Sequence, residues 1–118
     1  MKSSLIAVFL ALIIQSYYVY AQKDKQTLFV GKVNHLLQSK SYNKFNYLKC
    51  DNRVKLPSQL LAGESYFTAV RVYKSRKHLA VLSEFEIGIC MESLKEKEKC
   101  AIYPVINQGG TLCITSAN

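Results

Sequence analysis

Four cysteines are the residues with the clearest chemical potential in this chain of 118 residues: Cys50, Cys90, Cys100 and Cys113. No two of them have the Cys-x-x-Cys spacing and the chain has no His-x-x-x-His pair, so the sequence argues against a metal site. An even number of cysteines in a small chain predicts two disulfide bonds, provided that the chain is exported. Their spacing alone does not choose among the three possible pairings.

The other ionisable side chains do not form a recognisable catalytic set. The chain has two histidines, His35 and His78, and it contains no Gly-x-Ser-x-Gly, P-loop or dinucleotide-binding motif. Glu84 and Glu86 share one face of a predicted strand, which is typical of a solvated surface. With every cysteine assigned to a disulfide, no thiolate nucleophile is left. We therefore expect no catalytic residue, no cofactor and no metal, and the protein is not expected to be an enzyme.

Residues 1–21 have the three parts of a secretory signal peptide. Lys2 supplies the positive start, Leu5–Ile14 is an unbroken apolar run, and Val19–Ala21 offers small residues at the cleavage positions. The apolar run rises only about 15 Å as a helix, against a bilayer core of about 30 Å, which favours a cleaved leader over an anchor. We therefore expect a secreted, extracellular protein that consists of one domain, residues 22–118.

The chain is basic, with a formal net charge of +8, and loss of Lys2 with the leader leaves a charge of +7. The lysines are spread along the chain, and the densest run, Lys95–Lys99, is interrupted by Glu96 and Glu98. Dispersed positive charge favours weak attraction to a polyanion or an acidic partner over nucleic-acid binding. We therefore expect no nucleic acid as a partner. No segment after the leader is apolar and long enough to cross a membrane, so we expect no membrane as a partner either. We expect the protein to be a monomer.

A helix is predicted over Leu28–Lys40. Its apolar residues Phe29, Val33, Leu36 and Leu37 follow at i, i+4, i+7 and i+8, which forms one stripe along a helix. Everything after Tyr42 has strand character, in segments that cover residues 45–56, 65–73, 78–90, 100–106 and 111–115. A charged loop at 91–99 and a turn at 107–110 separate the last three.

The segment 78–90 has the clearest strand pattern of the five. Its apolar residues Leu79, Val81, Phe85, Ile87 and Ile89 all occupy odd positions, which predicts one face in the core and one in water. One helix followed by consecutive strands predicts an α+β fold, in which the N-terminal helix packs on an antiparallel sheet of four or five strands.

A short apolar segment, Gln59-Leu60-Leu61-Ala62-Gly63, joins the first two predicted strands. Gly63 can adopt a positive φ, so the segment is expected to form a tight hairpin. Leu60 and Leu61 then either project from the end of the sheet as a binding wedge or fold back into the core, and their spacing does not decide between these alternatives.

These residues resemble the cystatins, which inhibit papain-like cysteine proteases and carry Gln-x-Val-x-Gly in their first hairpin. Gln59, Ala62 and Gly63 fit that motif, with Leu61 in place of valine. Tyr66-Phe67 and Val70-Arg71-Val72 match the strand that follows it, and Cys100-Ala101-Ile102-Tyr103 looks like the strand near the second hairpin. The resemblance covers the chain from Leu28 to its end, and it implies a cystatin-like fold.

The same resemblance implies a function and a mechanism. Cystatins inhibit reversibly and non-covalently, because an N-terminal arm with a glycine and two hairpins fill the protease cleft. The residues expected to contact the protease are therefore Gln59, Leu60, Leu61, Ala62 and Gly63. The alternative is a secreted cystatin-fold binding module that does not inhibit proteases and engages another extracellular protein or a polyanion.

The chain departs from the cystatin pattern at the arm and at the second hairpin. No glycine lies between Ala21 and the predicted helix, and no tryptophan supplies the usual Pro-Trp of the second hairpin. The place of the Pro-Trp pair is taken by Ile106-Asn107 if the strand that begins at Cys100 is the penultimate one. It is taken by the charged loop 91–99 if the strand 78–90 is the penultimate one, and the strand at 111–115 is then an addition. The regular alternation of 78–90 favours the second of these, whereas the match of Cys100-Ala101-Ile102-Tyr103 favours the first, so both registers stay open. Loss of two contacts implies weaker inhibition.

The cysteine pairing depends on the same choice of register. The sequential pairing of the family would join Cys50 to Cys90 and Cys100 to Cys113. If 78–90 and 100–106 form a hairpin, Cys90 faces Cys100 instead, which leaves Cys50 with Cys113.

Overall fold

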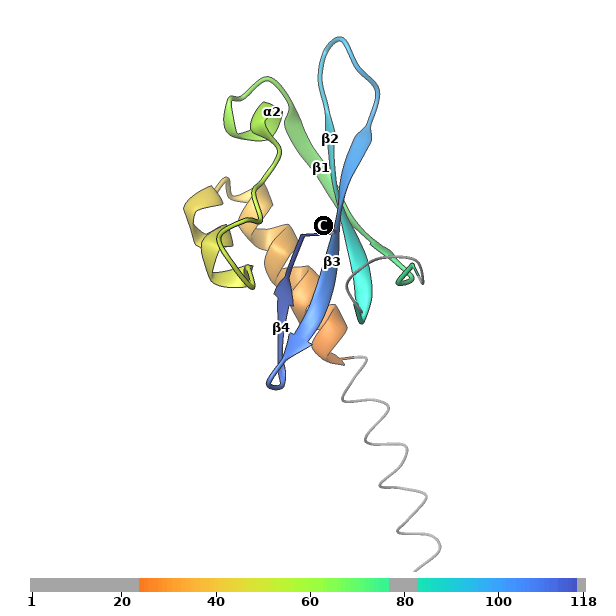
Figure 1. The fold of residues 1–118 in the computed structure, drawn as a ribbon. Coiled ribbons are helices and arrows are strands. Elements are labelled where there is room, and N and C mark those ends of the chain that lie inside the picture. Colours follow the sequence, from red (N-terminus) through yellow and green to blue (C-terminus); the bar gives the residue numbers. More distant parts are fainter. Residues whose placement is uncertain (1–23, 77–82, 117–118) are drawn as a thin grey trace, which may run out of the picture.

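The computed structural model describes residues 24–76 and 83–116 (Figure 1). The predicted leader, residues 1–21, lies outside the described residues, as do His78, Leu79 and Val81 at the start of the third predicted strand. In the described part the chain forms one long helix, two short helices and four strands.

The N-terminal helix, residues 24–38, confirms the predicted apolar stripe. Phe29, Val33 and Leu37 are buried, and Leu36 packs against the same core. The side chains thus recur every three to four residues on the face that meets the sheet, as an amphipathic helix requires.

The sheet contains four strands: β1 (Tyr66–Tyr73), β2 (Phe85–Glu92), β3 (Lys99–Gln108) and β4 (Thr111–Ile114). Their order in space is their order in sequence, and each neighbouring pair is antiparallel. Gly109 and Gly110 adopt φ of +59° and +90°, which forms the tight turn between β3 and β4. The predicted fold class is confirmed: a helix packed on a four-stranded antiparallel sheet, an α+β arrangement consistent with the cystatin-like fold.

The core lies between the N-terminal helix and the sheet. Phe29 of the helix meets Phe85 of β2 edge to face, with ring centroids 6.4 Å apart. The buried residues of the cluster are Phe29, Val33, Leu37, Phe45, Val54, Leu56, Leu60, Phe85, Ile87, Ile89, Met91, Val105 and Ile114. Burial of these side chains is the main favourable contribution to folding.

The predicted first strand, 45–56, is wrong. Tyr42–Leu48 forms a 3-10 helix, η1, and the residues after it form no regular strand. Tyr42, Phe45 and Leu48 recur every three residues, which matches the three residues per turn of a 3-10 helix, and Phe45 is buried while the other two pack on the core. The aromatic residues that favoured a strand here serve instead as anchors of a short helix.

The segment after η1 runs to the far edge of the sheet. Lys49 forms a parallel bridge with Ile114 of β4, and the backbone N–H of Cys50 donates to the Ile114 carbonyl at 2.8 Å. A disulfide joins Cys50 to Cys113 of β4, and the other disulfide joins Cys90 of β2 to Cys100 of β3. Cys90 and Cys100 are direct partners in the β2–β3 pairing, so the hairpin alternative gave the right pairing.

The prediction that one face of β2 lies in water is also wrong. The odd positions Ile87 and Ile89 are in the core as expected, but the even positions are buried too. Glu86, only 1% exposed, is held by the guanidinium of Arg76 at 2.7 Å. Cys90 is buried in its disulfide. Contacts with neighbouring parts of the chain therefore bury this face of β2.

Gly88 is the second even position of β2, and its lack of a side chain is required. A Cβ at this position would stand 2.8 Å from the ring of Tyr73 and 3.2 Å from Cδ1 of Ile102. The ring of Tyr73 thus lies where a side chain of residue 88 would be, which is the close approach that glycine permits.

We expect Gly88→Ala to lower the free energy of unfolding by about 2 kcal/mol, because the added methyl group displaces Tyr73. Urea unfolding measures this loss. In a Tyr73→Ala background the same substitution should cost little, so the double-mutant cycle should give a coupling of about 1 kcal/mol or more. Additive losses would mean that the ring does not occupy this space.

Candidate functional site

The motif Gln59–Gly63 does not form a hairpin. Since no strand precedes it, the segment leads into β1 as a single helical turn, α2 (Ser58–Leu61). The two leucines separate: Leu60 is 1% exposed and belongs to the core, whereas Leu61 is 54% exposed. Of the two alternatives considered from the sequence, burial in the core is thus true of Leu60 and exposure is true of Leu61.

The end of α2 is fixed by backbone hydrogen bonds around Gly63. The Gly63 N–H donates to the Leu60 carbonyl at 3.3 Å, and the Glu64 N–H donates to the Gln59 carbonyl at 2.9 Å. Gly63 adopts φ +75°, the left-handed conformation that this type of helix cap uses. The positive φ predicted for Gly63 is therefore present, but it ends a helix and does not close a hairpin.

A second exposed leucine lies in the loop between β2 and β3, residues 93–98. The Ser93 hydroxyl accepts the Glu96 N–H at 3.0 Å, and the Ser93 N–H donates to the Glu96 carbonyl at 3.2 Å. These bonds make a tight turn with Leu94 at its tip, where the side chain is fully exposed. The disulfide between Cys90 and Cys100 closes the base of this loop.

The two segments lie side by side at one end of the sheet (Figure 1). Together they line a hollow of about 570 Å³, formed by Gln59, Glu64 and Ser65 from one side and Ser93, Leu94, Lys95, Glu96 and Lys99 from the other. Loop 93–98 thus lies next to the Gln59–Gly63 segment, and β4 follows β3 at the edge of the sheet.

Polar contacts stiffen this end of the sheet. The Tyr66 hydroxyl donates to Glu92 at 2.9 Å, which links the start of β1 to the end of β2, and this hydrogen bond raises the pKa of Tyr66. Lys99 pairs with Glu96 at 2.8 Å across the loop, and its hydrogen bond lowers the pKa of the Glu96 carboxyl group. Both contacts are exposed, so they set geometry more than stability.

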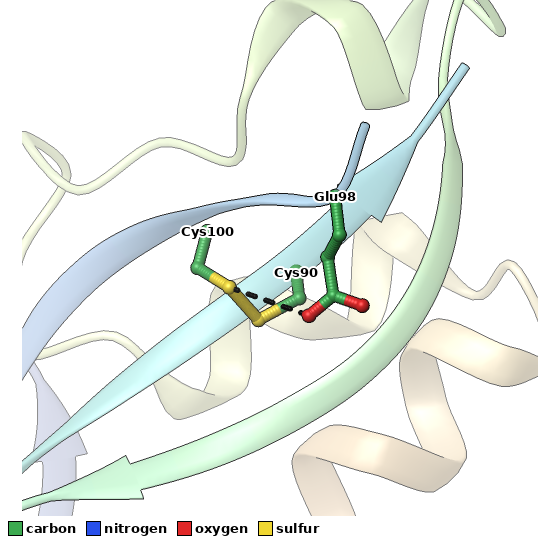
Figure 2. Close-up of side chains that lie close together, drawn as sticks. All are labelled: Cys90, Glu98 and Cys100. Atoms are coloured by element: carbon green, nitrogen blue, oxygen red, sulfur yellow. Dashed lines mark hydrogen bonds between the residues drawn. A yellow bond between two sulfur atoms is a disulfide. The ribbon is translucent and has the colours of Figure 1, made fainter. Parts of the chain in front are cut away.

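Within the described residues, the one cluster of potential metal ligands consists of Cys90, Glu98 and Cys100. Figure 2 shows that the two sulfur atoms are bonded to each other, with the Glu98 carboxylate 3.9 Å from the Cys100 sulfur. A disulfide sulfur carries no hydrogen and no charge, so this is a contact and not a ligand set. The carboxylate itself accepts hydrogen bonds from Arg71 at 2.6 and 3.0 Å.

Comparisons with models of protein families, with curated proteins and with solved structures find no match for this chain. Among residues 24–76 and 83–116, no helix is both long and apolar enough to cross a bilayer.

The sequence left open whether Leu60 and Leu61 are exposed or buried; Leu61, Ala62 and Gly63 are exposed, whereas Leu60 is buried. The prediction from sequence did not single out Leu94. The available signal was an isolated leucine in a stretch that is otherwise charged or polar, since a lone apolar side chain in such a loop has no core to join.

Proposed function

We propose that this chain is exported and that its mature form is a reversible, non-covalent inhibitor of papain-like cysteine proteases of the cathepsin type. The observation that carries the proposal is the pairing of two stiff segments, 57–65 and 93–98, each with an exposed leucine, at one end of the sheet. Two loops held by their own hydrogen bonds suit a protease cleft, because they lose little conformational entropy on docking.

The roles of the residues follow from their exposure. Leu61 and Leu94 supply the apolar surface that becomes buried in the cleft. Ala62 and Gly63 are exposed and small, so the protease can approach the backbone closely. Leu60 acts from inside the core as the anchor of α2, and the Gln59 carbonyl accepts the N–H groups that shape the turn. Inhibition by burial needs no bond to the protease thiolate.

The test uses protein secreted by an exporting host, with its N-terminus determined by mass spectrometry; the mature chain should begin at Gln22. This protein should inhibit papain or a cathepsin reversibly. Leu94→Ala and Leu61→Ala should each raise the inhibition constant about tenfold or more, because each removes a leucine from the buried contact.

Leu28→Ala is the matched control, since Leu28 is an exposed leucine on the N-terminal helix and outside both segments. It should leave the inhibition constant unchanged. Micromolar protein that leaves several papain-like proteases fully active would refute the inhibitor proposal and favour the non-inhibitory binding module. Equal losses from Leu28→Ala and Leu94→Ala would refute the assignment of the contact surface.

A further inference from the structure

A second hollow, of about 300 Å³, lies between the N-terminal helix and η1. It shares no residue with segments 57–65 and 93–98. Lys32 and His35 reach it from the helix, and Lys44 reaches it from η1. Two lysines and a histidine therefore line one concave surface.

The convergence of these side chains results from the way in which the helix ends. Lys40 adopts φ +57°, its N–H donates to the Leu37 carbonyl at 3.2 Å, and the Ser41 N–H donates to the Leu36 carbonyl at 3.0 Å. This helix cap reverses the chain, so that η1 packs back against the helix. Lys44 is thereby brought to the same hollow as Lys32, twelve positions earlier in the sequence.

Positive charge around this hollow is not balanced by acidic neighbours. Residues 24–49 contain the lysines 25, 32, 40, 44 and 49, and Asp24 is their one acidic residue. None of the ion pairs found between described residues involves Lys32, His35 or Lys44. The other acidic residues all follow Cys50 in the sequence. Residues 24–49 thus carry a local excess of positive charge, and no acidic residue lines the hollow.

The hollow also contains a surface suited to a ring. Tyr47 is 88% exposed at its rim, although it is a large aromatic residue, and Leu36 and Leu48 contribute apolar lining. The Ser39 hydroxyl donates to the carbonyls of His35 and Leu36 at 3.0 and 3.1 Å, and the Ser41 hydroxyl lies 3.0 Å from it, so these two oxygens can accept hydrogen bonds from hydroxyl groups of a ligand. Cations, hydroxyl groups and an exposed aromatic ring together match an anionic sugar better than a bare ion.

We propose that this hollow binds a sulfated polysaccharide. Lys32 and Lys44 pair with sulfate groups, the His35 imidazole supplies a hydrogen bond, the serine oxygens accept hydrogen bonds from sugar hydroxyl groups, and the ring of Tyr47 packs on a sugar face. A concave site suits a chain with protruding sulfate groups, whereas a flat anionic membrane would meet the lysines only at the rim. This site is independent of the proposed protease contact.

The test measures binding of a heparin-derived octasaccharide by calorimetry at several NaCl concentrations. Lys32→Glu with Lys44→Glu should weaken binding about tenfold or more at 0.15 M salt and should reduce its salt dependence. Lys55→Glu with Lys74→Glu is the matched control, because it changes the net charge equally at exposed lysines outside the hollow and outside segments 57–65 and 93–98. Tyr47→Ala should weaken binding about fivefold without altering the salt dependence, since its contact is not ionic.

Equal losses from the two lysine pairs would show that only net charge matters and would overturn the site. Binding of the desulfated octasaccharide with unchanged affinity would overturn the role of sulfate. A third arm uses vesicles with and without phosphatidylserine: retention on anionic vesicles that depends on Lys32 and Lys44, without octasaccharide binding, would replace the polysaccharide with a membrane. Inhibition of proteases is measured in parallel and should be the same in both lysine-pair variants.

Discussion

Replacement of Cys50 and Cys113 by alanine should lower the free energy of unfolding by about 4 kcal/mol. This disulfide spans 63 positions of the sequence, so it removes much of the conformational entropy of the unfolded chain. It also holds the segment after η1 against β4, where the Lys49–Ile114 bridge is the only strand pairing that the described part of that segment makes. Guanidinium-induced unfolding of the oxidised proteins measures the loss.

The double replacement of Cys90 and Cys100 is the matched comparison. This disulfide spans 10 positions, and its removal should cost about 3 kcal/mol. Its two strands are already paired along β2 and β3, so the native sheet should persist without it. A larger loss from this pair than from Cys50 and Cys113 would contradict the role given to the longer loop.

Arg76→Met should destabilise the protein by about 3 kcal/mol, because it leaves the buried carboxylate of Glu86 without its partner. The Arg76 Nε atom donates to both carboxylate oxygens, at 2.9 and 3.1 Å, so several charge-assisted hydrogen bonds are lost at once. The partial exposure of Arg76 keeps the expected cost at the lower end of the range for buried pairs. Thermal and urea unfolding at neutral pH measure it.

Arg71→Met provides the control, since it breaks an ion pair of similar length. The Arg71–Glu98 pair is more exposed, so its loss should cost less than about 1 kcal/mol. Replacement of both partners, Arg76→Met with Glu86→Leu, should recover most of the stability, because no charge is then left buried. If the double variant is no more stable than Arg76→Met, the cost arises from packing and not from the unpaired carboxylate.

The fold class, the helix and most of the sheet could be predicted because their signals are local. The stripe of Phe29, Val33 and Leu37 and the alternation around Ile87 and Ile89 each lie within one element. Burial of the other face of β2 could not be predicted in this way. Glu86 and Gly88 are covered by Arg76 and Tyr73, and those contacts exist only once the strands are paired.

The candidate site was predicted in part. The sequence identified Gly63 as a residue with positive φ, but a helix cap and a hairpin place the same demand on a glycine. The hairpin prediction failed because the predicted strand 45–56 does not exist: Tyr42–Leu48 is a helix, and without a strand before it the Gln59–Gly63 segment cannot be a hairpin. Assignment of Leu60 to the core and Leu61 to the surface depends on the turn of α2, which no alternation in the sequence reveals.

The two disulfides are nested: the link between Cys90 and Cys100 lies within the loop closed by Cys50 and Cys113. Segments 57–65 and 93–98 both fall inside the outer loop. One peptide-bond cleavage in either segment would therefore leave the two fragments covalently joined, and a cut in 93–98 is bridged by both disulfides. The two segments can thus be cut once by a protease without the molecule coming apart, so that damage at the proposed contact surface does not by itself release the rest of the domain.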